Sequence, residues 1–206
     1  DHSKISFSEI GRGLYWPDLK GYDAVFTVGG DGTVLEASHR LQNSIPLIGI
    51  RSSNFSVGYL CAGGVDDVER LVNDVVHATL SVVEVSRLQT EIHRAESGGR
   101  IVSDPVLNDF LFANASPAAT TRYRIKCRGI NEVQKSSGVW VATAAGSTAA
   151  IYAAGGTPCP LEATDYQFWV RELFVAPGQV RPVLSSGFFD SEESLVIENL
   201  CEQGLL

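Results

Sequence analysis

Residues 28–33 of the chain read VGGDGT, and the segments on either side of this stretch decide the fold. Residues 23–28, DAVFTV, form a short apolar run rich in β-branched side chains, which is typical of a buried strand. After the motif, apolar residues recur at helical spacing as far as Leu41. The sequence therefore predicts a sharp turn from a strand into a helix over residues 33–42.

The glycines of this turn predict a phosphate-binding site. Glycine has no Cβ, so the backbone bends sharply and a phosphate approaches the N–H groups at the helix N-terminus. Asp31 stands among the glycines. It is either a capping or turn residue or a carboxylate that accepts the proton of a hydroxyl group. The residues expected to form the phosphate site are Gly29, Gly30, Gly32 and Thr33.

Residues 1–78 read as a parallel α/β domain. A strand over 23–28, a helix over 33–42 and a strand over 46–50 form a βαβ unit, whose two strands we expect to be parallel. Residues 66–78 follow as an amphipathic helix with valine and leucine side chains on one face.

Residues 79–206 change to the pattern of a β-rich domain. β-prone segments over 81–93 and 101–113 are separated by a Ser-Gly-Gly turn, and further strands are expected over 138–143 and 194–198. The expected fold class is therefore an N-terminal parallel α/β nucleotide-binding domain followed by a β-sandwich-like domain.

Residues 121–128 alternate between the two faces of one strand. Thr, Tyr, Ile and Cys side chains point one way, and basic side chains point the other way. This basic face is either solvated, or it directs one or two of its cations towards a phosphate group. The cations are Arg122, Arg124, Lys126 and Arg128.

Composition argues against several classes of protein. The formal net charge of −8 disfavours a nucleic-acid partner. The four cysteines are far apart and lack metal-ligand spacing, which indicates reduced thiols of a cytoplasmic protein and no metal site. Residues 136–161 carry no charge, but they are mainly small residues and end in prolines, so we expect no membrane span. The absence of Met and the apolar ending at 204–206 predict that the natural chain extends further.

GGDGT, at residues 29–33, resembles the signature of a kinase superfamily that includes NAD kinases, diacylglycerol kinases, sphingosine kinases and, more distantly, phosphofructokinases. This resemblance implies phosphoryl transfer to a hydroxyl group and leaves the acceptor open. A lipid kinase would carry a Gly-rich Asn-Asp segment soon after the second strand, and residues 51–58 do not supply one.

Two later stretches resemble NAD kinases. Residues 107–109, LND, stand where that family has an Asn-Glu pair that binds ribose hydroxyls, and Asp109 is one methylene shorter than Glu. Residues 143–150, TAAGSTAA, followed by Gly155 and Gly156, resemble the family's TPTGSTAY segment, which packs against the adenosine of the substrate. The LND stretch and the alanine-rich TAAGSTAA segment together resemble the plant-type NADH kinase branch.

The resemblance implies an enzyme that uses ATP and Mg²⁺ to phosphorylate the 2′-hydroxyl of the adenosine ribose of NADH or NAD. It implies a homodimer in which Asp31 is the general base. The residues that it assigns to NAD(H) binding are Asn108, Asp109, Thr148, Ala149 and Arg122. A non-catalytic NAD(H)-binding relative is the alternative, because Asp109 and Ala150 depart from the family's pattern.

Overall fold

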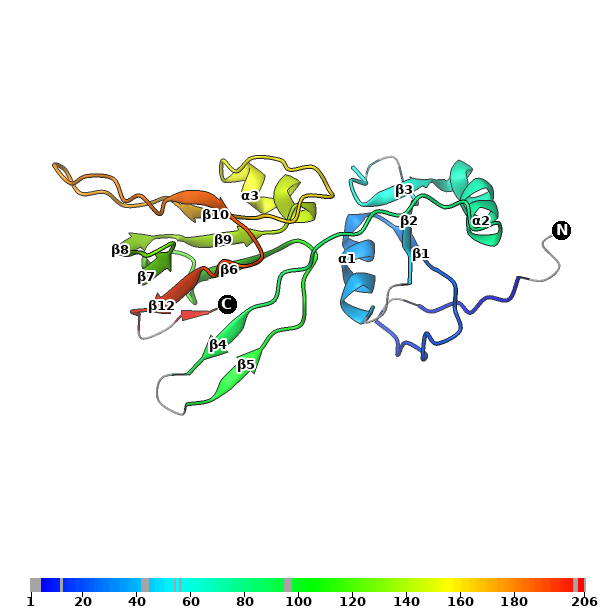
Figure 1. Ribbon diagram of the computed structural model, residues 1–206, viewed down its shortest axis with the longest axis horizontal. Helices are drawn as coiled ribbons and strands as arrows, with labels where there is room; N and C mark the ends of the chain where they lie inside the picture. The colour runs from blue at the N-terminus through cyan, green and yellow to red at the C-terminus, as the bar shows by residue number, and fades with distance from the viewer. Residues whose placement is uncertain are drawn as a thin grey trace. The chain divides into compact units, whose positions relative to one another are not determined.

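The computed structural model describes residues 5–11, 13–41, 45–53, 55, 57–94 and 98–201, and the backbone of residues 204–205. The chain divides into two compact units, Asp1–Leu80 and Ser81–Leu206 (Figure 1). The sequence predicts a boundary after residue 78, and the structure divides the chain after residue 80.

The first unit is built on a parallel sheet. Its strands are β1 (Val25–Gly29), β2 (Leu47–Arg51) and β3 (Cys61–Gly64), which lie in the order β1-β2-β3. Helix α1 (Asp31–Arg40) joins β1 to β2, and a short 3₁₀ helix, η1 (Val65–Asp67), leads from β3 into α2 (Val68–Val76). The predicted parallel α/β arrangement is confirmed. The sequence does not predict β3, because its residues CAGG include no β-branched side chain that would mark a strand.

The two helices of the first unit cover opposite faces of this sheet. Ile48 and Ile50 pack against Leu71 of α2, whereas Gly49 between them faces Val34 of α1. A Cβ on Gly49 would lie 2.7 Å from Val34 Cγ2, so α1 rests directly on the backbone of β2. This close packing holds the N-terminus of α1 next to the carboxyl end of β1.

The second unit contains two larger antiparallel sheets and a hairpin (Figure 1). The first sheet consists of β6 (Asp109–Asn114), β9 (Gly138–Ala142), β10 (Tyr166–Arg171), β11 (Ser186–Phe189) and β13 (Gly204–Leu205), in the order β11-β10-β9-β6-β13. The second sheet consists of β7 (Thr121–Cys127), β8 (Ile130–Ser136) and β12 (Val196–Asn199), in the order β12-β7-β8. The hairpin pairs β4 (Glu91–His93) with β5 (Arg100–Val102), and the short helices η2 (Ala145–Thr148) and α3 (Ala150–Ala153) follow β9.

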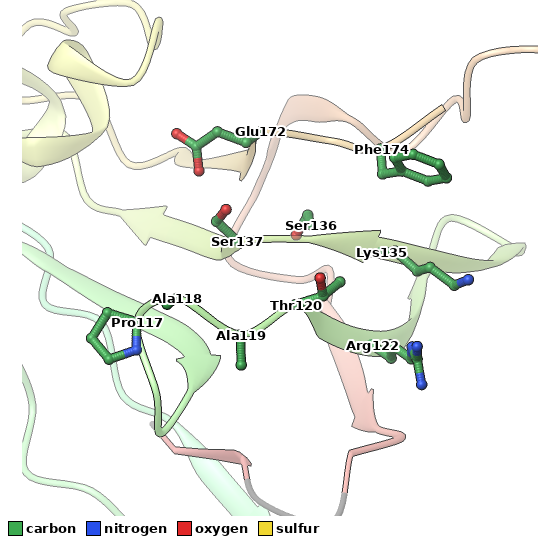
Figure 2. Close-up of a pocket in the computed structure, with 10 residues that line it drawn as sticks. All are labelled: Pro117, Ala118, Ala119, Thr120, Arg122, Lys135, Ser136, Ser137, Glu172 and Phe174. Carbon is green, nitrogen blue, oxygen red and sulfur yellow. The ribbon is translucent and has the colours of Figure 1, made fainter. Parts of the chain in front are cut away.

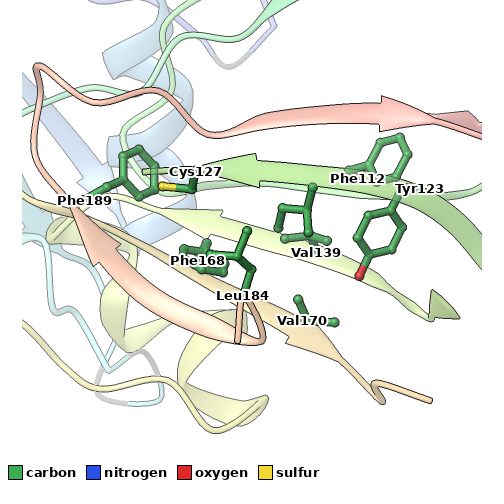
Figure 3. Packing of buried hydrophobic residues seen from close by; sticks show 9 residues of the cluster. Phe112, Tyr123, Cys127, Val139, Phe168, Val170, Leu184 and Phe189 are labelled. Atoms are coloured by element: carbon green, nitrogen blue, oxygen red, sulfur yellow. The ribbon is translucent and has the colours of Figure 1, made fainter. Parts of the chain in front are cut away.

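The core of the second unit lies between its two larger sheets (Figure 3). Tyr123 and Ile125 of β7 are fully buried. The Tyr123 ring packs edge to face against the Phe112 ring of β6, with 5.7 Å between the ring centroids. Burying a side chain of this size contributes about 1.5–3 kcal/mol. The buried members of this core are Phe112, Tyr123, Ile125, Cys127, Val139, Phe168, Val170, Leu184 and Phe189. The predicted β-rich, sandwich-like fold is confirmed.

The predicted strand over 101–113 is divided in the structure into β5 and β6. Pro105 lies between them and has no N–H to donate to a ladder. The predicted strand over 81–93 is shorter in the structure, where only its last three residues form β4.

Candidate nucleotide-binding residues

The turn between β1 and α1 places Gly29 and Gly30 directly before a ten-residue helix and Gly32 in its first turn. A Cβ on Gly29 would lie 2.2 Å from Thr33 Oγ1, so this position requires glycine. The Thr33 amide donates to the Gly30 carbonyl oxygen at 2.9 Å. The amides of Asp31 and Gly32 have no acceptor among the described residues, and the space beside Gly32 is open for 4 Å. Unpaired amides at a helix N-terminus suit an anionic group.

Asp31 is the first residue of α1, and its side chain is half-buried. Its Oδ1 accepts a hydrogen bond from the Leu60 amide at 2.8 Å, and its Oδ2 accepts one from the Tyr59 amide at 3.1 Å. The carboxylate therefore stands at the glycine-rich turn, as expected of a base, and also binds a distant segment, as expected of a structural residue.

Arg51, the last residue of β2, is a cation that no sequence motif marks. It is in register with Gly29 of β1, and its guanidinium makes no ion pair or hydrogen bond with the described part of the chain. Its place at the carboxyl end of a parallel strand is the signal that identifies it, because ligands of α/β sheets bind at that edge. The pKa of the neighbouring Cys61 thiol is raised, mainly by burial and further by Asp31, while Arg51 opposes this shift.

In the second unit, the LND stretch and the TAAGSTAA segment lie together. The Thr143 amide donates to the Asn108 carbonyl oxygen at 3.0 Å, and the Thr143 hydroxyl donates to the Leu107 carbonyl oxygen. The Gly146 amide in turn donates to Thr143 Oγ1 at 3.1 Å. A Cβ on Gly146 would clash with the Asn108 backbone, so the two segments meet only because residue 146 is glycine.

Ser147 holds the shape of the TAAGSTAA segment. It is fully buried, its hydroxyl donates to the Ala144 carbonyl oxygen at 2.6 Å, and its Oγ accepts from the Cys159 amide at 2.8 Å. Thr148 and Ala149 follow it and are half-buried. These two residues are therefore the more accessible part of the turn.

Asp109 begins β6 opposite Ala142 of β9. Burial raises the pKa of its carboxyl group above the usual value. The carboxyl group has no hydrogen bond or ion pair within the described ranges. Leaving an ionised group without a partner in such a place costs stability, which is common at binding sites.

Arg122 lies apart from Asn108 and Gly146. The Thr121 hydroxyl accepts from the amide of Asn114 at the end of β6, whereas Asn108 precedes the start of that strand. An extended strand of this length separates the two positions by about 20 Å. Arg122 instead lines a hollow beside β7 and β8 with its register partner Lys135 (Figure 2). The residues assigned to NAD(H) binding thus do not form one cluster.

The other three cations of the basic strand face carboxylates. Arg124 and Lys126 lie 3.0 Å and 3.6 Å from Glu198 Oε2. Arg128 binds both oxygens of Glu193 at 2.5 Å, and this bond lowers the pKa of Glu193. For these three residues the basic face is a set of exposed ion pairs rather than a phosphate site.

Among the residues that the structure describes, no three or more His, Cys, Asp or Glu side chains group as metal ligands. No helix in these residues has the length and apolar character needed to cross a membrane.

Comparison with known proteins identifies the family. Residues 18–79 match the ATP-NAD kinase N-terminal domain. A probable NADH kinase from Oryza sativa subsp. japonica is 30% identical over 197 residues, which cover 85% of this chain and 59% of that protein. The NADH kinase of Arabidopsis thaliana is 31% identical over 209 residues, which cover 89% of this chain and 63% of that protein. The chain belongs to the NAD kinase family.

This NAD kinase family member spans about three fifths of the length of its two plant relatives. Its fold is similar to that of yeast NADH kinase complexed with NADH, with a TM-score of 0.75, 18% identity, and coverage of 88% of this chain and 52% of that one. It is also similar to an NAD kinase from Archaeoglobus fulgidus in complex with ATP, with a TM-score of 0.63, 20% identity, and coverage of 89% and 70%. Both structures confirm the NAD kinase-like fold.

Proposed function

We propose that this NAD kinase family member transfers the γ-phosphoryl group of ATP to the 2′-hydroxyl of the adenosine ribose of NADH or NAD. The observation that carries the proposal is the similarity, over 85% and 89% of the chain, to two plant proteins named as NADH kinases. The turn between β1 and α1 supports it, because unpaired helix amides and a carboxylate stand together at the end of a strand.

On the donor side, the amides of Asp31 and Gly32 bind phosphate oxygens, and Arg51 adds a guanidinium at the neighbouring strand end. Charge-assisted hydrogen bonds of this kind are roughly twice as strong as neutral ones. Positioning and electrostatic stabilisation supply most of the acceleration in phosphoryl transfer.

The nucleotide would bind as its Mg²⁺ complex. Protein-bound Mg²⁺ usually keeps several waters and takes one or two carboxylates together with substrate phosphates. The described residues fit this role, because the Asp31 carboxylate stands at the phosphate turn. When bound, the ion offsets the charge that develops on the phosphate oxygens.

On the acceptor side, Asn108 and Asp109 bind ribose hydroxyls, and Thr148 and Ala149 line the adenosine pocket. The Asp109 carboxyl has no partner within the described residues, so it can accept hydrogen bonds from such hydroxyls. Asp31 accepts the proton of the attacking 2′-hydroxyl. At the same time the oxygen of that hydroxyl bonds to the γ-phosphorus, and the bond between this phosphorus and the ADP oxygen breaks.

Formation of NADP(H) from ATP with NADH or NAD tests the proposal. Asp31→Asn is expected to bind nucleotide and to lower kcat by about 10²-fold or more, the range for a lost general base. Asp23→Asn, which removes an exposed carboxylate from the same unit, is the matched control. A wild-type protein that forms no NADP(H) would reject the function.

A non-catalytic NAD(H)-binding protein is the second candidate. It is favoured by one observation, namely that backbone amides already engage both oxygens of Asp31. It predicts NADH binding in calorimetry without any NADP(H) product.

The family resemblance also supports a homodimer, and the unpaired cysteines support a cytoplasmic location. Analytical ultracentrifugation tests the first proposal, and cell fractionation tests the second.

A further inference from the structure

The carboxylate of Asp31 is held by a turn that lies far from it in the sequence. The Leu60 amide donates to Oδ1 at 2.8 Å, and the Tyr59 amide donates to Oδ2 at 3.1 Å. The Cys61 amide donates to the Gly58 carbonyl oxygen at 3.2 Å and closes the turn. One carboxylate thus receives two backbone donors from adjacent residues.

Strand pairing anchors one end of this turn, where Cys61 pairs with Gly49 of β2 and Leu60 is half-buried. The side chains of Phe55, Val57 and Tyr59, within and before the turn, are all exposed. Among the described residues, the two hydrogen bonds to Asp31 link the 58–61 turn directly to the GGDGT turn.

We infer that the 58–61 turn is a positioning element for the Asp31 carboxylate, an inference that rests on the proposed function. A carboxylate left alone rotates broadly about its last torsion, whereas two N–H donors fix both of its oxygens. An ionised carboxylate offers about four acceptor sites, so each oxygen of Asp31 still has room for a substrate hydroxyl. The turn sets the direction from which Asp31 takes the proton.

Replacing Asp31 alone merges two effects. In Asp31→Asn the carboxamide keeps one oxygen, but its NH₂ group cannot accept a bond from Tyr59 or Leu60. The variant loses the base and one link to the turn together. A decisive experiment therefore changes the turn and leaves Asp31 in place.

Gly58→Ala makes that change. Gly58 has φ +70°, and a Cβ there would lie 3.0 Å from Arg51 Cδ. Gly21 has φ +90° with nothing within 4 Å of a Cβ, so Gly21→Ala brings similar backbone strain to the same unit and is the matched control. We expect Gly58→Ala to lower kcat by about tenfold to 10²-fold, as small misplacements do. We expect its KM for NADH to change by less than about twofold, the pattern of a lost transition-state contact, and Gly21→Ala to keep the wild-type kcat.

Amide hydrogen exchange of the whole chain tests the same link without any activity. In Asp31→Ala we expect the amides of Tyr59 and Leu60 to exchange at least about tenfold faster, while the amides of β1 keep their wild-type protection. Unchanged exchange at Tyr59 and Leu60 would overturn the inference, and so would equal kcat values for Gly58→Ala and Gly21→Ala. A wild-type protein without NADP(H) formation refutes the proposed function instead, and the exchange rates still decide whether Asp31 holds the turn.

Discussion

Gly146 meets Asn108 backbone to backbone, so closely that a Cβ on residue 146 would lie 2.1 Å from the Asn108 carbonyl oxygen. The hydrogen bonds of Thr143 to the same stretch reinforce this contact. The contact depends on the absence of a side chain and not on any functional group. It brings the stretch that carries Asn108 against the segment that carries Thr148.

Gly146→Ala is expected to destabilise the protein by about 1–3 kcal/mol, since the added methyl group must push the Asn108 backbone away. The proposed ribose-binding residue moves with that backbone, so NADH binding should weaken as well. Gly98→Ala is the control, because a Cβ there meets nothing within 4 Å even though φ is +61°. Urea unfolding and calorimetric titration with NADH are the measurements, and equal results for the two variants would show that the contact is dispensable.

Asp109→Asn is expected to stabilise the protein at neutral pH and to weaken NADH binding. Burial raises the folded-state pKa of this carboxyl group. The stability that its protonated form contributes is fully present below the unfolded-state pKa of about 3.9. It is lost as pH rises through the higher folded-state pKa.

The difference in unfolding free energy between Asp109→Asn and wild type should therefore be small at about pH 3 and larger at about pH 7. Asp104→Asn, at an exposed carboxylate of the same unit, should show no such rise. Denaturant unfolding at several pH values makes the measurement. A difference that does not vary with pH would contradict the assignment.

Arg51→Gln is expected to raise the KM for ATP by about tenfold or more, the effect of losing a hydrogen bond to a charged group. Arg40→Gln removes the same charge from an exposed position in the last turn of α1, and it should leave this KM unchanged. Initial rates at varied ATP provide the test. Identical KM values for the two variants would exclude Arg51 from the phosphate site.

NADH is expected to be phosphorylated with a higher kcat/KM than NAD. The TAAGSTAA segment resembles the NADH-preferring branch, and Ala150 stands exposed where many NAD kinases have an aromatic residue. A tenfold preference requires only about 1.4 kcal/mol. Ala150→Tyr should reduce the preference, whereas Ala153→Tyr, also exposed on α3, should not. Kinetics with both dinucleotides at equal ATP and Mg²⁺ decide the matter, and an equal or higher kcat/KM for NAD in the wild-type protein rejects the expectation.

Strands in which apolar and polar residues alternate strictly could be predicted from the sequence. Strands that place polar residues in the core could not. β7 has its small and apolar residues buried in the predicted pattern. β8 reads as polar because Gln134 and Ser136 point into the core, where they bond to the Tyr123 hydroxyl at 3.1 Å and 2.9 Å. Burial raises the pKa of Tyr123 to about 12, so this group stays neutral and satisfies both partners. A hydrogen-bonded polar core of this kind carries no hydrophobic period.

The candidate site shows the same division. The glycine-rich turn could be predicted because its residue types dictate its backbone. The amides that hold Asp31 could not, because Tyr59 and Leu60 donate through their backbones and any residue except proline can do so. The separation of Arg122 from Asn108 depends on the path of the chain between them, which no local pattern records.

The contact of Gly49 with α1 has a consequence for how the protein tolerates mutation. The space beside Gly49 is filled by Val34, the Leu60 carbonyl oxygen and the Cα of Cys61. Any side chain there must displace the helix that begins with Asp31. In a saturation library selected for NADP(H) formation, variants at residue 49 should be depleted as strongly as variants at residue 31. Depletion at residue 31 would result from loss of the carboxylate, and depletion at residue 49 would result from steric overlap between the added side chain and α1.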